Sequence, residues 1–275
     1  MRRWMKHLAG RNIFITLWKV TMKNIKAVVL AAGKGTRISS AETDAPKVMR
    51  MACEKPLLGY VLEAISFIEK KDTIIVVGYK KESIIDYFGE KNYTYVIQEE
   101  QLGTGHAVMA AKEELKDYKG NVLLCYGDMP LMRSEAYENL LKTHIEQEND
   151  CTILSSENED TMSFGRIERD ENGQFVHIVE DKDCTPRQKK ITELNTGIYI
   201  FDTELLLSAL GELKNNNSQG EYYVTDVPKI MKDKNAKIGI YKSNLADDII
   251  GVNTVEQLNL VEDILRRRKW QKNPN

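Results

Sequence analysis

A short apolar run at residues 27–30 leads directly into a glycine turn that carries two cations, and this junction constrains the fold more than any other segment. Gly33 and Gly35 lack a Cβ atom, so backbone N–H groups there can approach an anion closely. Lys34 and Arg37 can supply positive charge to a polyphosphate. The junction predicts a β-strand that ends in a phosphate-binding loop, although such a turn also serves as an ordinary connection from strand to helix.

The spacing of this turn excludes two common phosphate-binding loops. A P-loop needs the pattern Gly-x-x-x-x-Gly-Lys-Ser/Thr, but here Lys34 stands between the two glycines. A dinucleotide-binding turn needs a third glycine three residues after the second, where this chain has Ile38. The turn therefore favours neither a P-loop ATPase nor a dehydrogenase.

Strand-like and helical patterns alternate through the first half of the chain. Short β-branched runs predict strands at residues 74–77, 93–97, 122–125 and 152–154. Apolar residues at helical spacing predict helices at residues 56–68, 104–115 and 134–147. This alternation predicts an α/β fold with a doubly wound, mostly parallel sheet that helices cover on both faces. Ligands of such sheets bind at the carboxyl ends of the strands, where the phosphate-binding loop is expected.

The second half of the chain has a different pattern. Residues 165–180 alternate polar and apolar side chains on either side of Asn172-Gly173, which predicts a β-hairpin. A further strand is expected at residues 198–201 and a helix at residues 203–213. We expect this half to extend the sheet and to add a small lobe over one end of a cleft.

Composition fits a soluble enzyme of the cytoplasm. The 275 residues, of which 42% are hydrophobic, suffice for a large core. The formal net charge of -2 gives no electrostatic reason to expect nucleic acid or an anionic membrane surface as a partner. The four cysteines lie far apart, which indicates neither a zinc site nor a disulfide framework and fits a reducing compartment.

Residues 1–24 form a basic segment around an apolar run at residues 13–18. The run is too short to span a bilayer, and no small-residue cleavage site follows it. We interpret the segment as an N-terminal extension that is either disordered or the product of a start codon assigned too far upstream. A membrane-lying anchor is the alternative. The predicted organisation is this extension, one domain at residues 25–270, and a tail at residues 271–275.

Five motifs resemble, in the same order, those of the sugar-nucleotide pyrophosphorylases. They are Leu-Ala-Ala-Gly-Lys-Gly-Thr-Arg with a later Pro-Lys at residues 30–47, Gln-Glu-Glu-Gln-Leu-Gly-Thr-Gly-His-Ala at 98–107, Tyr-Gly-Asp-Met-Pro-Leu at 126–131, Glu-Leu-Asn-Thr-Gly at 193–197 and Gln-Gly-Glu-Tyr-Tyr-Val-Thr-Asp at 219–226. The match runs from about Ile25 to about Arg268 and is similar to the uridylyltransferase domain of bacterial N-acetylglucosamine-1-phosphate uridylyltransferases. The resemblance implies a Rossmann-like nucleotidyltransferase domain with a small sugar-binding lobe.

The resemblance also implies a reaction. Uridylyl would pass from UTP to N-acetylglucosamine 1-phosphate, giving UDP-N-acetylglucosamine and pyrophosphate with Mg²⁺ as cofactor. Two alternatives remain open: another sugar 1-phosphate, of glucose or N-acetylgalactosamine, or a sugar-nucleotide-binding regulatory subunit without turnover. The presence of both Lys47 and Asp128 argues against the second.

Nucleotidyl transfer places one phosphate oxygen against another phosphate, so the attacking group is already an anion. It needs charge neutralisation and in-line positioning rather than a general base, and a divalent ion is the usual solution. The resemblance assigns catalysis to Arg37, Lys47 and Asp128, and the metal to Asp128 and Asn253. From the residues alone, Asp128 could cap a turn and Asn253 could cap a helix at residues 254–267.

The resemblance divides the remaining site residues between the two substrates. The nucleotide is assigned to Leu30, Ala31, Ala32, Gly33, Lys47, Gln98, Gly103 and Thr104. The Gln98 carboxamide offers a donor and an acceptor to the imide edge of uracil, although a polar loop capping the next helix explains that segment equally well. The sugar is assigned to Tyr126, Gly127, Gly165, Glu180, Asn195, Tyr223 and Asn253. Carboxylate and amide groups suit sugar hydroxyls, and an aromatic face can cover the sugar ring.

Two features depart from the family pattern. The segment at residues 38–45 is longer than in the bacterial enzymes, and Glu54 stands where the family has glycine. The sequence also contains no six-residue repeats of the left-handed β-helix that carries an acetyltransferase in the two-function bacterial enzymes. We therefore expect a protein that accepts only the acetylated sugar phosphate and that is a monomer or a weak dimer.

Overall fold

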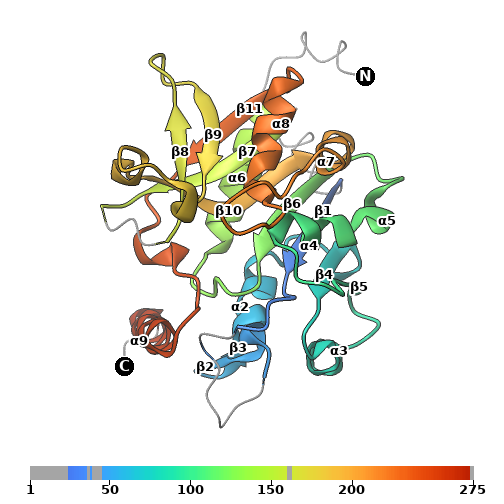
Figure 1. Ribbon diagram of the computed structural model, residues 1–275. Helices are drawn as coiled ribbons and strands as arrows, with labels where there is room; N and C mark the ends of the chain where they lie inside the picture. Colours follow the sequence, from blue (N-terminus) through green and yellow to red (C-terminus); the bar gives the residue numbers. More distant parts are fainter. Residues whose placement is uncertain (1–23, 36–37, 39–44, 160–162, 273–275) are drawn as a thin grey trace, which may run out of the picture.

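The computed structural model describes residues 24–35, 38, 45–159 and 163–272. A large twisted sheet runs through the middle of this part of the chain, with helices packed on both of its faces (Figure 1). The predictions for the N-terminal extension up to residue 23, for Arg37 and for residues 273–275 lie outside the described residues.

The sheet combines a parallel and an antiparallel part. Nine strands of the described residues form it, in the order β11-β7-β10-β6-β1-β4-β5, with β8 paired to β10 and β9 paired to β8. The seven strands of the main path are β1 (Ile25–Leu30), β4 (Thr73–Val77), β5 (Thr94–Ile97), β6 (Asn121–Tyr126), β7 (Cys151–Glu157), β10 (Glu193–Asp202) and β11 (Ile238–Lys242). Parallel pairing joins β6-β1-β4-β5 and β11-β7, whereas β10 runs antiparallel to both β6 and β7. The predicted α/β class with a mostly parallel sheet is confirmed.

Helices on both faces explain why the central strands are apolar without alternation. Alternate residues of β1 enter two different cores: Ala27 and Val29 face one, and Val28 and Leu30 face the other. The first core is covered by α2 (Leu57–Ala64), α3 (Lys81–Phe88) and α6 (Ser134–Glu146). The second is covered by α4 (Thr104–Ala110), α5 (Lys112–Leu115), α7 (Thr203–Leu210) and α8 (Val227–Asp233).

The predicted hairpin is confirmed as β8 (Gly165–Arg169) and β9 (Phe175–Val179). Its turn is held by the Asp170 carboxylate, whose Oδ1 accepts the backbone N–H groups of Asn172 and Gln174 at 2.9 and 2.8 Å. Gly173 has a φ of +73°, in the left-handed region that glycine tolerates. The Asn-Gly pair therefore gave a reliable local signal.

Two predicted helices have different limits in the structure. The helix expected at residues 104–115 divides at Ala111, whose N–H bonds to the Val108 carbonyl only three residues back. The helix expected at residues 56–68 ends at Ala64, yet Ile65 and Ile68 remain buried. Apolar spacing identified the buried face in both cases but not the local break in helical geometry.

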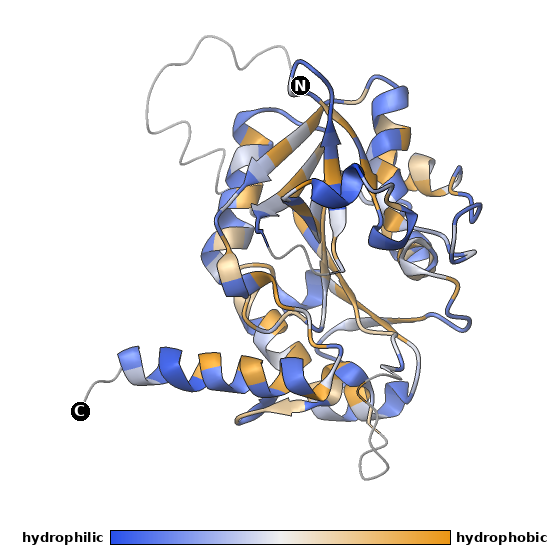
Figure 2. Cartoon of the chain, turned by 60° about the vertical axis from the view of Figure 1, so that its left-hand side comes forward, coloured by the Kyte–Doolittle hydropathy of each residue, from blue (hydrophilic) through white to orange (hydrophobic). Residues whose placement is uncertain are grey.

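A third, smaller core attaches the last helix, α9 (Val255–Lys272), to the rest of the molecule. Val261 and Ile264 of α9 pack with Leu57 of α2 and with Ala52 of the small hairpin formed by β2 (Met51–Ala52) and β3 (Lys55–Pro56). Figure 2 shows α9 extending away from the sheet, with a mostly hydrophilic surface on its outer turns. Among the described residues, no helix is both long and apolar enough to cross a membrane.

Candidate active site

The glycine turn after β1 lies between the end of β4 and Lys47. The Ala31 N–H donates to the Val76 carbonyl at 2.8 Å, and a Cβ atom added at Gly78 would lie 2.9 Å from the Ala32 carbonyl oxygen. Gly35 has a φ of +70°, and a Cβ there would lie 2.6 Å from the Cβ of Lys47. The glycines thus allow close backbone packing that brings Lys47 against the turn.

Lys34 and Arg37 are the two other cations predicted to meet a polyphosphate at this turn, and the structure does not place Lys34 in that position. Lys34 is exposed, and its Nζ lies 5.1 Å from the centre of the Tyr79 ring, so it packs on an aromatic face instead of lining the cavity described below. Arg37 lies outside the described residues. Of the two such cations that the structure describes, Lys34 and Lys47, only Lys47 lines the cavity.

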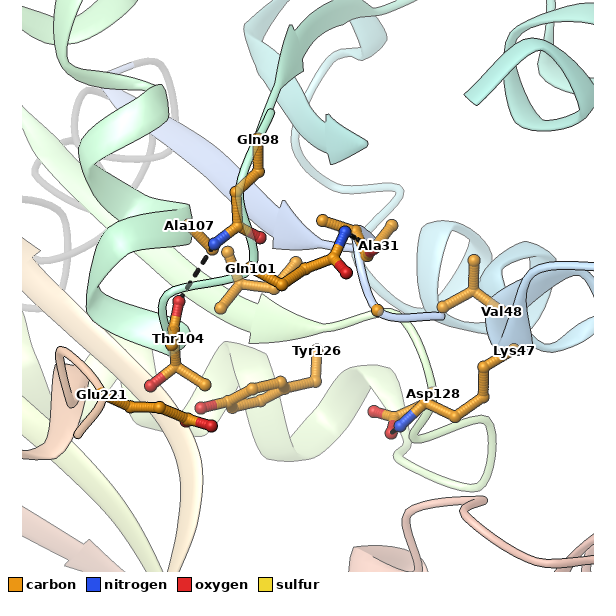
Figure 3. A pocket seen from close by; sticks show the side chains of 14 residues that line it. Ala31, Lys47, Val48, Gln98, Gln101, Thr104, Ala107, Tyr126, Asp128 and Glu221 are labelled. Carbon is orange, nitrogen blue, oxygen red and sulfur yellow. Dashed lines mark hydrogen bonds and ion pairs between the residues drawn. The ribbon is translucent and has the colours of Figure 1, made fainter. Parts of the chain in front are cut away.

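A cavity of about 250 Å³ opens at the carboxyl ends of β1 and β6 (Figure 3). Its lining includes every residue predicted to bind the nucleotide: Leu30, Ala31, Ala32, Gly33, Lys47, Gln98, Gly103 and Thr104. Tyr126, the last residue of β6, and Asp128, two residues after it, line the cavity as well. Segments far apart in the sequence therefore meet at one edge of the sheet, as the topology rule predicts.

Gln98 lies at one end of this cavity and is only 4% exposed. Its Nε2 donates to the Gly103 carbonyl at 3.1 Å and lies 3.2 Å from His106 Nδ1. Because both of these contacts use Nε2, the carboxamide oxygen is the polar atom of Gln98 that faces the cavity (Figure 3). Thr104 does not cap its own helix: its hydroxyl accepts the N–H of Val224 at 3.1 Å. The helix-capping interpretation of this loop therefore does not describe the structure.

The motif at residues 219–226 packs directly on this loop. Gly103 has a φ of +111°, and a Cβ there would lie 2.6 Å from the Tyr222 carbonyl oxygen. The Gly105 N–H donates to the same carbonyl at 2.7 Å. Close packing of the two loops brings Glu221 into the cavity lining. Both glycines are needed because each stands where a side chain would strike the backbone of the other loop.

Lys47, Asp128 and Asn253 form the charged centre of the site. Lys47 Nζ lies 2.5 Å from Asp128 Oδ2 and 2.9 Å from Asn253 Oδ1, although the partners are 81 and 206 residues away in the sequence. The Asp128 carbonyl accepts the N–H of Val252 at 2.9 Å, which fixes the segment before Asn253.

Asn253 is not the cap of α9. Thr254 Oγ1 accepts the N–H of Gln257, and Gln257 Oε1 accepts the N–H groups of Asn253 and Thr254 at 2.7 and 3.1 Å. This reciprocal arrangement is a capping box, with Thr254 and Gln257 as its members. The Asn253 carboxamide is instead directed to Lys47, and the helix-cap interpretation of Asn253 is wrong.

The oxygens of Asp128 and Asn253 fit a hard divalent cation. Both converge on one positive charge, that of Lys47, and carboxylate and amide oxygens are the ligand types that Mg²⁺ prefers. In the part of the chain that the structure describes, no three His, Cys, Asp or Glu side chains gather to hold a metal. Two protein oxygens suit Mg²⁺, which keeps several waters and takes further oxygens from phosphates.

Some of the predicted sugar residues lie near Tyr126. Burial raises the pKa of Tyr126, and the nearby Glu180 carboxylate raises it further. A Cβ added at Gly197, where β10 is irregular, would lie 2.3 Å from the Tyr126 ring. Asn195 stands just before this irregularity and pairs in register with Gly165 of β8. The hairpin and β10 thus bring their polar groups toward the ring.

These polar groups already have protein partners. Asn195 Nδ2 lies 2.7 Å from the Tyr199 hydroxyl, and the Glu180 carboxylate accepts the Thr225 hydroxyl at 2.9 Å. The Tyr223 hydroxyl accepts Gln219 Nε2 at 2.8 Å. Burial raises the pKa of Glu180, while the Thr225 hydrogen bond opposes that shift.

The remaining predicted sugar residues differ in position. The Gly127 N–H donates to the Leu30 carbonyl at 2.9 Å, next to the glycine turn. Of the residues predicted for the sugar, only Tyr126 is among the described residues that line the cavity.

Four lining residues were not among the residues assigned from the sequence to either substrate, to the metal or to catalysis: Val48, Gln101, Ala107 and Glu221. Gln101 lies in the same loop as Gln98, and its Nε2 approaches the Ala32 carbonyl at 3.5 Å. Its position three residues after Gln98, in the same motif, could have identified it as a cavity residue from the sequence. Glu221 lies in the motif at residues 219–226, which marked it as a neighbour of the sugar residues, but its place in the cavity lining depends on the packing of two loops distant in the sequence.

Several known proteins are similar to this chain. A family model described as Nucleotidyl transferase matches residues 26–269. The "Bifunctional protein GlmU" of Streptococcus mutans serotype c is 42% identical over 242 residues, which is 88% of this chain and 52% of that protein. The protein of the same name from Clostridium novyi is 44% identical over 242 residues, again 88% of this chain and 52% of that protein. The chain thus spans about half the length of these curated relatives.

A solved structure shares the fold. The structure of UDP-glucose pyrophosphorylase complexed with UDP-glucose aligns with a TM-score of 0.69 at 20% identity, covering 88% of this chain and 98% of that one. Since the family model covers nearly the whole of the described chain, the protein belongs to the nucleotidyl transferase family.

Proposed function

We propose that this protein transfers uridylyl from UTP to N-acetylglucosamine 1-phosphate, releasing pyrophosphate and UDP-N-acetylglucosamine. The observation that carries the proposal is the cavity, which gathers the phosphate-binding turn, Gln98 and the Lys47–Asp128 pair at one edge of the sheet. The order and identity of the five sequence motifs, together with relatives about 42% identical over most of the chain, support the same assignment.

The chain's own groups suit the chemistry of phosphate attack on phosphate. The sugar phosphate is already an anion, so what the site must supply is positive charge and alignment. Lys47 supplies one charge beside the turn at Gly33 and Gly35. Asp128 and Asn253 would hold Mg²⁺, which when bound neutralises charge on the phosphate oxygens. No general base is required, which agrees with the hydrogen bonding of His106 to Gln98.

Two ends of the site suit two substrates. Gln98 and the backbone at Gly103 suit a base that has adjacent N–H and carbonyl groups, as uracil does. Glu180 and Asn195 suit sugar hydroxyls. The Tyr126 ring lines the cavity, and it is close enough to the Glu180 carboxylate for that charge to raise its pKa. We therefore infer that the nucleotide lies in the cavity and the sugar lies beside Tyr126.

The test is a substrate panel. Purified protein is mixed with UTP, Mg²⁺ and the 1-phosphates of N-acetylglucosamine, glucose and N-acetylgalactosamine, and pyrophosphate is measured. We expect the highest kcat/KM with N-acetylglucosamine 1-phosphate. Preference for another sugar would replace the substrate assignment, and no pyrophosphate with any member would contradict the enzymatic function.

A further inference from the structure

The Lys47 ammonium group occupies a position that a divalent cation would need. It contacts both Asp128 Oδ2 and Asn253 Oδ1, at 2.5 and 2.9 Å. The side chains of Lys47 and Asp128 are 16% and 12% exposed, so water screens this pair only in part. The ion pair is therefore a strong local interaction, and it already aims both oxygens at one point.

An ammonium group and a divalent cation cannot share these two oxygens. Mg²⁺ bonds to oxygen at about 2.0–2.1 Å, so a metal on Asp128 Oδ2 and Asn253 Oδ1 would lie almost on top of the ammonium nitrogen. Repulsion between the two positive charges would be severe at that separation. Binding of the metal therefore requires the Lys47 head group to leave.

The structure provides a place for the head group to go. The Lys47 stem is held beside the glycine turn, since its Cβ lies within 2.6 Å of the position a Gly35 Cβ would take. Lys47 also lines the cavity together with residues 31–33 of the turn. A lysine side chain has a flexible four-carbon stem, so the ammonium can turn from Asp128 toward a phosphate bound at the turn without movement of the backbone.

We propose that Lys47 is an internal counter-ion of the metal site, which keeps the site's affinity for a divalent cation low until a polyphosphate draws the ammonium away. The two binding events are then coupled: phosphate at the turn raises metal affinity, and metal at Asp128 raises phosphate affinity by the same factor. This inference rests on the proposed function, because it takes a nucleoside triphosphate to be the ligand of the turn.

The test measures metal binding without nucleotide. Mn²⁺ takes the same oxygen ligands as Mg²⁺, and its free fraction can be followed by electron paramagnetic resonance. We expect Lys47→Met to bind Mn²⁺ at least about tenfold more tightly than the wild-type protein, because a positive charge has left the site. Lys47→Arg, which keeps the charge, should bind Mn²⁺ as weakly as wild type. Lys47→Gln repeats the test in a polar background, should Lys47→Met fold poorly by circular dichroism.

Two control variants define the site and the charge effect. Lys116→Met removes the lysine of an exposed pair with Glu113, so it changes net charge equally and should leave Mn²⁺ affinity unchanged. The double variant Lys47→Met with Asp128→Asn should lose the gained affinity. Equal or weaker Mn²⁺ binding by Lys47→Met, or an equal gain in Lys116→Met, would overturn the proposal. Because no nucleotide is present, these outcomes are independent of the pyrophosphate assay, which alone decides the proposed function.

Discussion

The two parts of the sheet build their shares of the site in different ways. In the parallel part, the turn after β1 presents mainly backbone, and glycines permit its close packing against β4 and Lys47. In the antiparallel part, polar side chains near β9 and β10 approach Tyr126 and are already hydrogen-bonded to protein, as Asn195 is to Tyr199. On the proposed function, the first part would bind phosphates through backbone groups, and the second would bind sugar hydroxyls through side chains that are already held in place.

This difference implies that substitutions should separate the two substrates. A change at the charged centre should affect turnover, because charge on the phosphates is greatest during the reaction. A change near Tyr126 should affect the KM of the sugar phosphate alone. A change at Gln98 should affect which base is accepted. The predictions below follow in that order, from the largest effect to the smallest.

The largest effect is expected from Asp128→Ala. This variant removes the carboxylate that pairs with Lys47 and that would hold the metal, so we expect kcat to fall by roughly a hundredfold or more. Asp233→Ala, which removes an exposed carboxylate paired with Lys229, is the control and should keep its activity. Steady-state pyrophosphate release measures both. Nearly full turnover by Asp128→Ala, or by wild type in excess chelator, would exclude a metal at this position.

Glu180→Gln should act on the sugar alone. The variant keeps the shape of the side chain but weakens its acceptor for a sugar hydroxyl, so we expect KM for the sugar 1-phosphate to rise about tenfold, the scale of one hydrogen bond to a charged group. KM for UTP should change by less than about twofold, since Glu180 is not among the cavity-lining residues.

Glu168→Gln is the matched control for that variant. It removes a carboxylate from β8 in the same lobe, where Glu168 pairs with Arg187. A parallel rise in both KM values for Glu180→Gln, or an equal sugar effect for Glu168→Gln, would break the division between the two parts of the site.

Gln98→Ala should relax the choice of base. Loss of the carboxamide removes a contact that distinguishes uracil from cytosine, so the ratio of kcat/KM for UTP over CTP should fall by about tenfold. Gln101→Ala removes the other glutamine of the same cavity and should change this ratio far less. If wild type already uses all four nucleoside triphosphates equally, Gln98 has been assigned the wrong role.

The smallest effect concerns the pH dependence of folding stability, through a histidine that packs where the two parts of the sheet meet. His144 of α6 is 4% exposed and contacts Asn121 of β6 and Thr152 of β7. Burial lowers its pKa to about 4, against an ordinary value of 6.5. The unfolded chain therefore binds a proton between these values while the folded chain does not, and the folded state loses stability as pH falls through that window.

His144→Gln should remove this pH dependence. Between pH 7.5 and pH 5, the wild-type Tm should fall by about 3–6 °C more than that of the variant. Differential scanning calorimetry at the two pH values gives the comparison. Parallel falls in Tm for both proteins would show that His144 does not titrate in the folded state as its burial implies.

Local patterns predicted the parts of the site that lie on short segments. The glycine turn, the strands that end beside it and the hairpin at Asn172-Gly173 each follow from a few neighbouring residues, and the carboxyl-end rule then joins the turn to Asp128. The roles of Lys47 and Asp128 came from the resemblance to the pyrophosphorylases, and these patterns place both residues at the same edge of the sheet.

Other features depend on packing between segments that no local pattern relates. The contact of Asn253 with Lys47 spans 206 residues, and from the residues alone Asn253 was better explained as a helix cap. Glu221 reaches the cavity because Gly103 and Gly105 admit the backbone at Tyr222. Lys34 was expected at the phosphates, but a neighbouring aromatic ring at Tyr79 holds it in this structure. In each case the deciding contact is tertiary.

The most direct test of the division between the two parts of the sheet is a crystal structure with UDP-N-acetylglucosamine bound. We predict that the uracil lies within hydrogen-bond distance of Gln98 and the backbone at Gly103 and Thr104, and that the sugar hydroxyls contact Glu180 and Asn195 beside Tyr126. A ligand bound with its base beside Glu180, or with its sugar remote from both Glu180 and Asn195, would contradict the account.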